Sequence, residues 1–160
     1  ALEASGLAQK NQSDYGVSLY SLTAEGEKTD HLLFELARLG RRMPHPPEMQ
    51  KPGNLRTIAV SLGTACKRAV GPDHNFAATL LIDSEAYRLT ARGGDAQIRV
   101  GAAENADLVM TTSYEPMMAL ADGEITRDVF VSNHVALEVI TPGKENEFFD
   151  LLTSAIKEFH

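Results

Sequence analysis

The chain has 160 residues, of which 43% are hydrophobic and 23% charged, and its formal net charge at pH 7 is −7. Such values are typical of an ordinary soluble globular protein with one or two small domains and enough residues for a sizeable core. The charge is uneven, because residues 1–54 hold six Lys or Arg and seven Asp or Glu, whereas residues 55–160 hold nine and fifteen. We therefore expect the C-terminal two-thirds to bind nucleic acid poorly, while the near-neutral first third permits DNA contact.

Two further features indicate where the protein works. No stretch approaches the length of about eighteen apolar residues that a membrane span requires, and residues 1–5 lack the basic start and apolar centre of a signal peptide. We therefore expect a cytoplasmic protein with no membrane partner. Cys66 is the only cysteine and falls in the apolar pattern of residues 55–70. It is predicted to pack as a small hydrophobic residue, with a redox-sensor role as the alternative.

The first third predicts a hairpin followed by a helix. Residues 7–10 and 17–22 have extended character around the polar tip 11–16, which suggests two strands joined by a long loop. Thr23 is expected to cap the helix that follows and runs to Gly40. Leucines recur along that helix at helical spacing: Leu32, Leu33, Leu36 and Leu39.

This part of the sequence resembles a family of transcription regulators. Residues 2–7 (Leu-Glu-Ala-Ser-Gly-Leu), the hairpin, residues 20–26 (Tyr-Ser-Leu-Thr-Ala-Glu-Gly) and the Leu-rich helix are similar to the second half of an HxlR-type winged-helix regulator, and MarR-type regulators share much of the pattern. The resemblance implies that the hairpin is the wing of a DNA-binding domain. It also implies that the four leucines pair two subunits in a homodimer. The recognition helix, which major-groove readout needs, would precede Ala1, so we interpret the chain as a fragment of a longer regulator.

The wing implied by this resemblance supplies the candidate DNA-binding residues. These side chains would contact phosphate or the minor groove: Gln9, Lys10, Asn11, Gln12, Ser13 and Tyr15. A hairpin with a purely structural role is the competing interpretation for each of them.

A Pro-rich stretch divides the chain. Residues 40–53 contain four prolines and two glycines, which exclude a continuous helix or a central strand. We expect a linker at 43–54, between a partial winged-helix domain at 1–42 and a second domain at 55–160.

The second domain is predicted to be α+β. The expected elements, in chain order, are a helix over 55–70, strands at 76–82, 87–91, 96–100 and 107–112, a helix over 114–122, a strand at 135–139 and a final helix after Pro142-Gly143. Ser113 is a plausible N-cap for the short helix, and Gly123 ends it. Together these elements predict a five-stranded, mainly antiparallel sheet with helices on one side.

The order of these elements, with the pattern of strand, cap, Met-rich helix and Gly over residues 106–124, resembles the sterol-carrier-protein-like domains. The resemblance covers nearly all of residues 55–159, although the segment 128–134 stands where that family often has a Gly-rich stretch. It implies a tunnel between sheet and helices that holds an apolar ligand. The candidate lining residues are Met117, Met118, Leu120, Phe130, Phe148, Phe149 and Leu152. Plain core packing is the alternative for each of them.

The sequence shows no catalytic or metal-binding motif. It lacks a Gly-rich phosphate loop, His-Glu-x-x-His, paired cysteines and Gly-x-Ser-x-Gly, and its five histidines are scattered. We therefore expect no enzyme, no cofactor and no metal. The leading hypothesis is a DNA-binding transcription regulator whose C-terminal effector domain takes a small apolar ligand. The alternatives are a lipid carrier or sequestering protein without a role on DNA, and a dimerisation module with a filled core.

Overall fold

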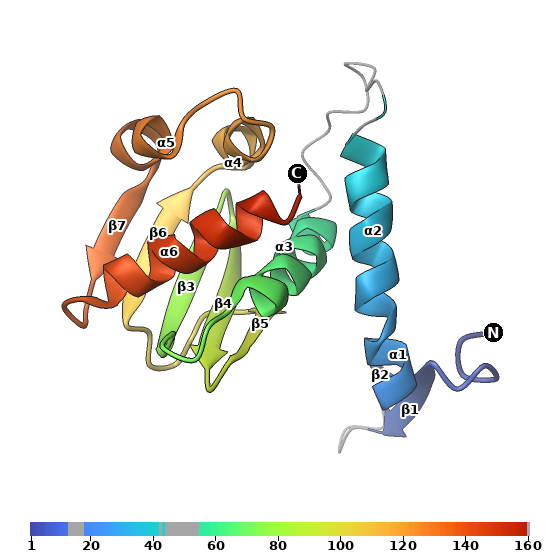
Figure 1. Cartoon of the computed structure of the whole chain (residues 1–160). Helices are drawn as coiled ribbons and strands as arrows, with labels where there is room; N and C mark the ends of the chain where they lie inside the picture. The colour runs from blue at the N-terminus through green and yellow to red at the C-terminus, as the bar shows by residue number, and fades with distance from the viewer. Residues whose placement is uncertain (13–17, 42, 44–54, 160) are drawn as a thin grey trace.

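The structure, a computed structural model, describes residues 1–12, 18–41, 43 and 55–159 (Figure 1). The first part consists of β1 (Ala8–Gln12), β2 (Ser18–Leu22), α1 (Ala24–Glu27) and α2 (Thr29–Arg41). The strands pair antiparallel, with Lys10 opposite Tyr20, so the predicted hairpin is present. Thr23 caps α1, since its side-chain oxygen accepts a hydrogen bond from the Gly26 amide at 3.1 Å. The predicted linker lies outside the described residues, apart from Met43.

The second part contains a five-stranded sheet. Its elements are α3 (Leu55–Ala69), β3 (Phe76–Ile82), β4 (Glu85–Arg92), β5 (Asp95–Val100), β6 (Leu108–Thr112), α4 (Tyr114–Ala121), α5 (Arg127–His134), β7 (Ala136–Val139) and α6 (Lys144–Lys157). The strand order is β5-β4-β3-β6-β7. The sheet is mixed, because β6 runs parallel to β3 while the other neighbours are antiparallel. A parallel neighbour requires a crossover, and residues 101–107 supply it by carrying the chain past β4 and β3.

The core lies between this sheet and the two long helices α3 and α6, which cover the same face (Figure 1). Strand alternation directs apolar side chains to that face, and Leu80 in β3, Leu89 in β4 and Met110 in β6 are each at most 1% exposed. Phe148 of α6 is fully buried against Phe76, with ring centres 5.8 Å apart and the rings edge to face. The predicted α+β architecture with helices on one side of a five-stranded sheet is confirmed.

The helix α5 was not predicted. Its sequence, Arg-Asp-Val-Phe-Val-Ser-Asn-His, has two β-branched valines and little amphipathic character, which weakens the helical signal. The structural cause of the helix is Thr126, whose side-chain oxygen accepts a hydrogen bond from the Val129 amide at 3.3 Å. Packing completes it, since Phe130 is only 3% exposed. The connection from β6 to β7 therefore contains two helices, α4 and α5.

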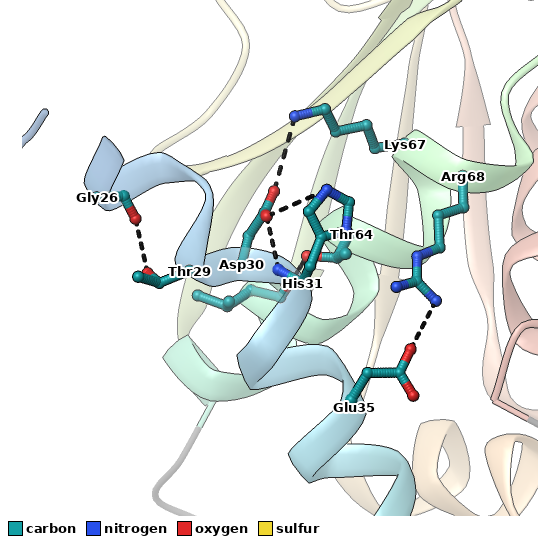
Figure 2. Close-up of polar contacts among 9 residues, drawn as sticks. Gly26, Thr29, Asp30, His31, Glu35, Thr64, Lys67 and Arg68 are labelled. Carbon is teal, nitrogen blue, oxygen red and sulfur yellow. Dashed lines mark hydrogen bonds and ion pairs between the residues drawn. The ribbon is translucent and has the colours of Figure 1, made fainter. Parts of the chain in front are cut away.

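The helix α2 packs on α3 of the same chain through a face that the sequence pattern did not reveal. Phe34 is fully buried, 5.0 Å from the ring of Phe159, and the Arg68 guanidinium lies 4.3 Å from the Phe34 ring centre. Figure 2 shows the ion pairs beside it, in which Arg68 contacts Glu35 at 3.0 Å and Lys67 contacts Asp30 at 3.7 Å. The apolar ring and the flanking charges fix α2 against α3 and the end of α6.

Candidate functional site

The short helix α4 has an unusual degree of exposure for its composition. It has the sequence Tyr-Glu-Pro-Met-Met-Ala-Leu-Ala, yet none of its residues is fully buried. Ser113 occupies the N-cap position with extended backbone but makes no side-chain cap bond, and Gly123 follows the helix with φ +75°. The predicted start at Tyr114 is correct, and the helix ends at Ala121, one residue before the predicted end, with Gly123 after it as expected. The Ser113 cap is present only in its backbone conformation. A helix so apolar and so incompletely covered has side chains available for further contact.

The helices α4 and α5 contact each other and lie side by side at the end of the sheet where β6 runs into α4 (Figure 1). Partly buried apolar side chains pack against the core from this region: Tyr114, Met117, Leu120, Ile125, Val131, Val135, Leu137 and Leu152. Five of these had not been predicted as candidates. Ile125, Val131 and Val135 lie in or beside the helix α5 that the sequence did not predict, while Tyr114 and Leu137 belong to elements that it did.

The predicted lining residues divide into two groups. Phe130, Phe148 and Phe149 are at most 9% exposed, and the rings of Phe148 and Phe149 lie 5.2 Å apart edge to face. All three are members of the buried core cluster, and we refer to them together as the aromatic floor. Met117, Leu120 and Leu152 are partly buried and pack against the same core. Met118 is also partly buried but is not part of this packing.

A cation stands at the margin of this apolar region. Arg127, the first residue of α5, is exposed and its guanidinium carbon lies 5.6 Å from the centre of the Phe149 ring. Within the described part of the chain it forms no ion pair with a carboxylate. Arg127 was not predicted from the sequence, because only its place after Thr126, at the start of an unpredicted helix, would have singled it out.

The titratable groups with shifted pKa values have structural roles. Hydrogen bonds from Lys144 at 2.7 Å and from the Asn75 amide at 2.9 Å lower the pKa of Glu147. Burial raises the pKa of Asp107, but hydrogen bonds from Ala77 and Thr141 and the charges of Lys144 and Arg92 outweigh it, so the net shift is downward. Glu147, in the first turn of α6, accepts a hydrogen bond from the Asn75 backbone amide. Asp107, just before β6, accepts one from the Ala77 backbone amide.

Cys66 packs in the core, as predicted. It is fully buried, and desolvation raises the pKa of its thiol to about 12. A protonated, inaccessible thiol is a poor nucleophile, which argues against the redox-sensor alternative. In the part of the chain that the structure describes, no three His, Cys, Asp or Glu side chains gather where they could hold a metal ion.

Two of the candidate wing side chains have partners within the hairpin. The amides of Gln9 and Asn11 both donate to the Ser21 hydroxyl, at 3.2 and 2.8 Å. Lys10 is exposed on the other face of β1, and Gln12 ends that strand. Ser13 and Tyr15 lie outside the described residues. The bonds of Gln9 and Asn11 match the structural interpretation of the hairpin.

The four leucines of α2 face away from α3. Their exposed fractions are 62% for Leu32, 47% for Leu33, 54% for Leu36 and 58% for Leu39. Because Phe34 faces α3, α2 has one covered apolar position and a separate exposed leucine face, which we define as these four residues. Exposed apolar surface of this kind is typical of an interaction site. None of the helices in the described residues is long and apolar enough to cross a bilayer.

Known proteins resemble this chain in fold rather than in sequence. No protein-family model matches the chain, and no curated protein matches it. The solution structure of sterol carrier protein domain 2 from Helicoverpa armigera is similar, with a TM-score of 0.50 and 15% identity over 72% of this chain and 95% of that one. The chain shares its fold with this sterol carrier protein domain. The resemblance of residues 1–42 to a winged helix gains no support from these similarities.

Two other solved structures are similar at lower TM-scores. A sterol carrier protein 2 like 2 from Aedes aegypti has a TM-score of 0.43 and 17% identity over 64% of this chain and 97% of that one. An inverting sec-alkylsulfatase from Pseudomonas sp. has a TM-score of 0.48 and 16% identity over 61% of this chain. The chain spans only 15% of the length of that sulfatase.

Proposed function

We propose that residues 55–159 form a carrier or sequestering domain for a small apolar, lipid-like molecule. The observation that carries this proposal is α4, an apolar helix without a fully buried residue, whose Met117 and Leu120 pack against the core that contains the aromatic floor. The sterol-carrier-protein-like fold supports it. From the sequence alone this function was the alternative to DNA-binding regulation, and it now has the better support.

The physical basis of binding is the adaptability of α4. Methionine has an unbranched, flexible side chain that fills irregular space, so Met117 and Met118 can repack around ligands of different shape. The aromatic floor is closely packed and stays in place. A ligand between floor and α4 removes apolar surface from water on both partners, which stabilises the complex by about 25 cal/mol per Å² buried.

Binding can be tested with the neutral dye Nile red on delipidated protein. We expect saturable binding that 1-decanol displaces. Leu120→Asp and Met117→Asp each place a charge among the partly buried apolar side chains and should weaken dye binding at least tenfold. The matched control is Val100→Asp at the edge strand β5, where Val100 is 62% exposed and a charge should leave dye binding unchanged. Absence of dye uptake by the unmutated chain would support the dimerisation module with a filled core instead.

A second proposal concerns assembly, because the leucine face is an exposed apolar surface. We propose that it pairs with the same face of a second copy to form a homodimer. Leu32, Leu36 and Leu39 of α2 follow one another at spacings of four and three, which is the spacing of the seam of a helix pair, and the exposed Met43 follows the helix. All four are exposed, with Met43 at 60%. Such a dimer does not require the DNA-binding role.

Sedimentation velocity of the double variant Leu36→Ser/Leu39→Ser tests this assembly. We expect a monomer, and the matched control Leu2→Ser should remain dimeric although Leu2 is equally exposed, at 60%. If the double variant sediments like the unmutated chain, the leucine face does not mediate pairing.

A further inference from the structure

Two arginines lie side by side on the face of the sheet that is turned away from α3 and α6. In β4 the residues Tyr87, Leu89 and Ala91 are buried, so the alternation of a strand places Arg88 on the other face. Arg88 is directly opposite Arg99 of the edge strand β5, and residues in that relation share a face. The pairing of β4 with β5 therefore brings two guanidinium groups to neighbouring positions on one face.

The charges of this arginine pair are not compensated within the described residues. The side chain of Arg88 forms no hydrogen bond, ion pair or ring contact there. Arg99 donates from Nε and Nη2 to the side-chain oxygen of Gln97, at 3.2 Å each, which orients the guanidinium but adds no negative charge. Like charges directly opposite each other in a sheet are destabilising, so an anion bound between the two would stabilise the fold.

Other cations of this domain are arranged differently. Arg92 in β4, further along the same face, is opposite Asp95 in β5, so that pair has complementary charges. Arg127 and Lys157 are exposed and have no carboxylate partner within the described residues, but they lie on different helices, α5 and α6. At the arginine pair, the strand register itself brings two uncompensated charges together.

The crossover between β5 and β6 forms one border of this place. Thr79 in β3 is opposite Arg88 on the side away from Arg99. Its hydroxyl accepts a hydrogen bond from the Ala103 amide at 3.0 Å, and Thr79 is only 5% exposed. Residues 101–107 therefore reach this face beside Arg88, which is partly buried, while Arg99 is exposed. Protein on one side excludes water there, which strengthens the attraction of the two charges for an anion.

We propose that Arg88 and Arg99 together bind the phosphate group of a small phosphate monoester. At pH 7 such a group carries a charge of about −1.5 to −2, which balances two guanidinium groups. Its three terminal oxygens can accept from the paired N–H donors of both arginines at once. A carboxylate has a single charge, which one arginine balances, so the pair favours phosphate over carboxylate. The site lies on the opposite face of the sheet from the proposed carrier region and does not depend on it.

Titration with methyl phosphate at pH 7.5 and low salt, followed by phosphorus NMR, tests the proposal. We expect saturable binding of one methyl phosphate per chain, with weaker binding of acetate. Arg88→Gln and Arg99→Gln should each lower the affinity for methyl phosphate about tenfold, the loss of one charge-assisted hydrogen-bonding partner. The matched control is Lys157→Gln, which changes the net charge equally at an exposed cation without a carboxylate partner and should leave the affinity unaltered.

The same titration can overturn the proposal. Equal losses in all three variants would mean that net charge, and not the arginine pair, attracts the phosphate. Absence of saturable binding to the unmutated chain would also refute it. So would binding to vesicles of phosphatidic acid without binding of methyl phosphate, because the phosphate would then have to be presented by a membrane.

The unfolding temperature separates a binding role of Arg99 from a structural one. Without phosphate, Arg99→Gln removes one of two like charges and should unfold at the same temperature as the unmutated chain or at a higher one. Methyl phosphate should raise the unfolding temperature of the unmutated chain but not that of the variant. If Arg99→Gln unfolds at a lower temperature without phosphate, Arg99 stabilises the fold by itself and the proposal is wrong.

Discussion

The two parts of the molecule use apolar residues in opposite ways. In residues 55–159 the sheet and α6 share an apolar core, in which Leu80, Leu89 and Phe148 are almost or fully buried. Among the residues of 1–43 whose burial the structure describes, only Gly26 and Phe34 are buried, while four leucines of α2 are exposed. One part makes its own core, and the other depends on surfaces outside itself.

This difference shows what an amphipathic pattern can and cannot reveal. Leucines at helical spacing indicate that a helix has an apolar face, but not what covers it. In α2 the covered position is Phe34, which lies outside the leucine pattern and packs on Phe159 and Arg68. The leucine face stays exposed, so α2 has one covered and one uncovered apolar face.

The largest loss of stability should come from a substitution in the core of residues 55–159. Phe148→Ala removes a fully buried ring that packs on Phe76 and Phe149, and should lower the free energy of unfolding by about 3–5 kcal/mol. The matched truncation in the other part is Leu39→Ala, 58% exposed, which should stay within about 0.5 kcal/mol for the monomer. Urea unfolding of both variants measures the contrast, and equal losses would show that the two parts do not differ as described.

The next effect concerns the junction between the parts. Phe34→Ala empties the contact between α2, Arg68 and Phe159, and should cost about 3 kcal/mol. Because the sheet domain retains its core, the loss should appear as local opening of α2. Hydrogen exchange should then show α2 amides losing protection while β3 and β4 keep theirs. Unchanged protection of α2 would mean that the ion pairs Asp30–Lys67 and Glu35–Arg68 hold the junction without the ring.

Most of the elements could be predicted from sequence, because alternation and helical spacing report burial directly. The hairpin, the five strands, α3, α4 and α6 all followed from these patterns. The helix α5 did not, since its valines and weak amphipathicity gave little signal and its cap, Thr126, lies just outside the segment. The parallel pairing of β6 with β3 was also not predicted, because the sequence of a strand does not identify the strand beside it.

The candidate site was predicted less completely than the fold. The resemblance to sterol carrier domains selected Met117, Leu120 and Leu152, which pack against the core that also contains the three phenylalanines. It could not separate the closed floor from the partly exposed residues, because periodicity does not distinguish degrees of burial. Arg127 was missed for a different reason, since it begins α5, the helix that the sequence did not predict.

A smaller loss of stability is expected from a substitution at Gly26 in α1, the short helix that follows the hairpin. A Cβ at Gly26 would collide with the carbonyl oxygen of Leu7, so backbone must move to accept any side chain. Gly26→Ala should therefore lower the stability of this part by about 1–3 kcal/mol. The control is Gly40→Ala in α2, where nothing lies within 4 Å of the added carbon. Hydrogen exchange in the hairpin and α1 measures the result, and a neutral Gly26→Ala would show that this part is loosely packed throughout.

The smallest effect is electrostatic and again separates the two parts. The pKa of Glu147 is lowered by hydrogen bonds from Lys144 and the Asn75 amide, so its carboxylate stabilises the fold above the unfolded pKa of about 4.3 and that contribution is lost as pH falls through the lower folded value. Glu147→Gln should reduce stability at pH 7 and flatten the decline of stability below about pH 5.

Glu25 also pairs with a lysine, at 2.6 Å, but both side chains are more than two-thirds exposed. Exposed pairs contribute little, so Glu25→Gln should leave the free energy of unfolding at pH 7 nearly unchanged. Equal losses at pH 7 for the two variants would mean that the bond from Asn75, which Glu25 lacks, adds nothing to the ion pair.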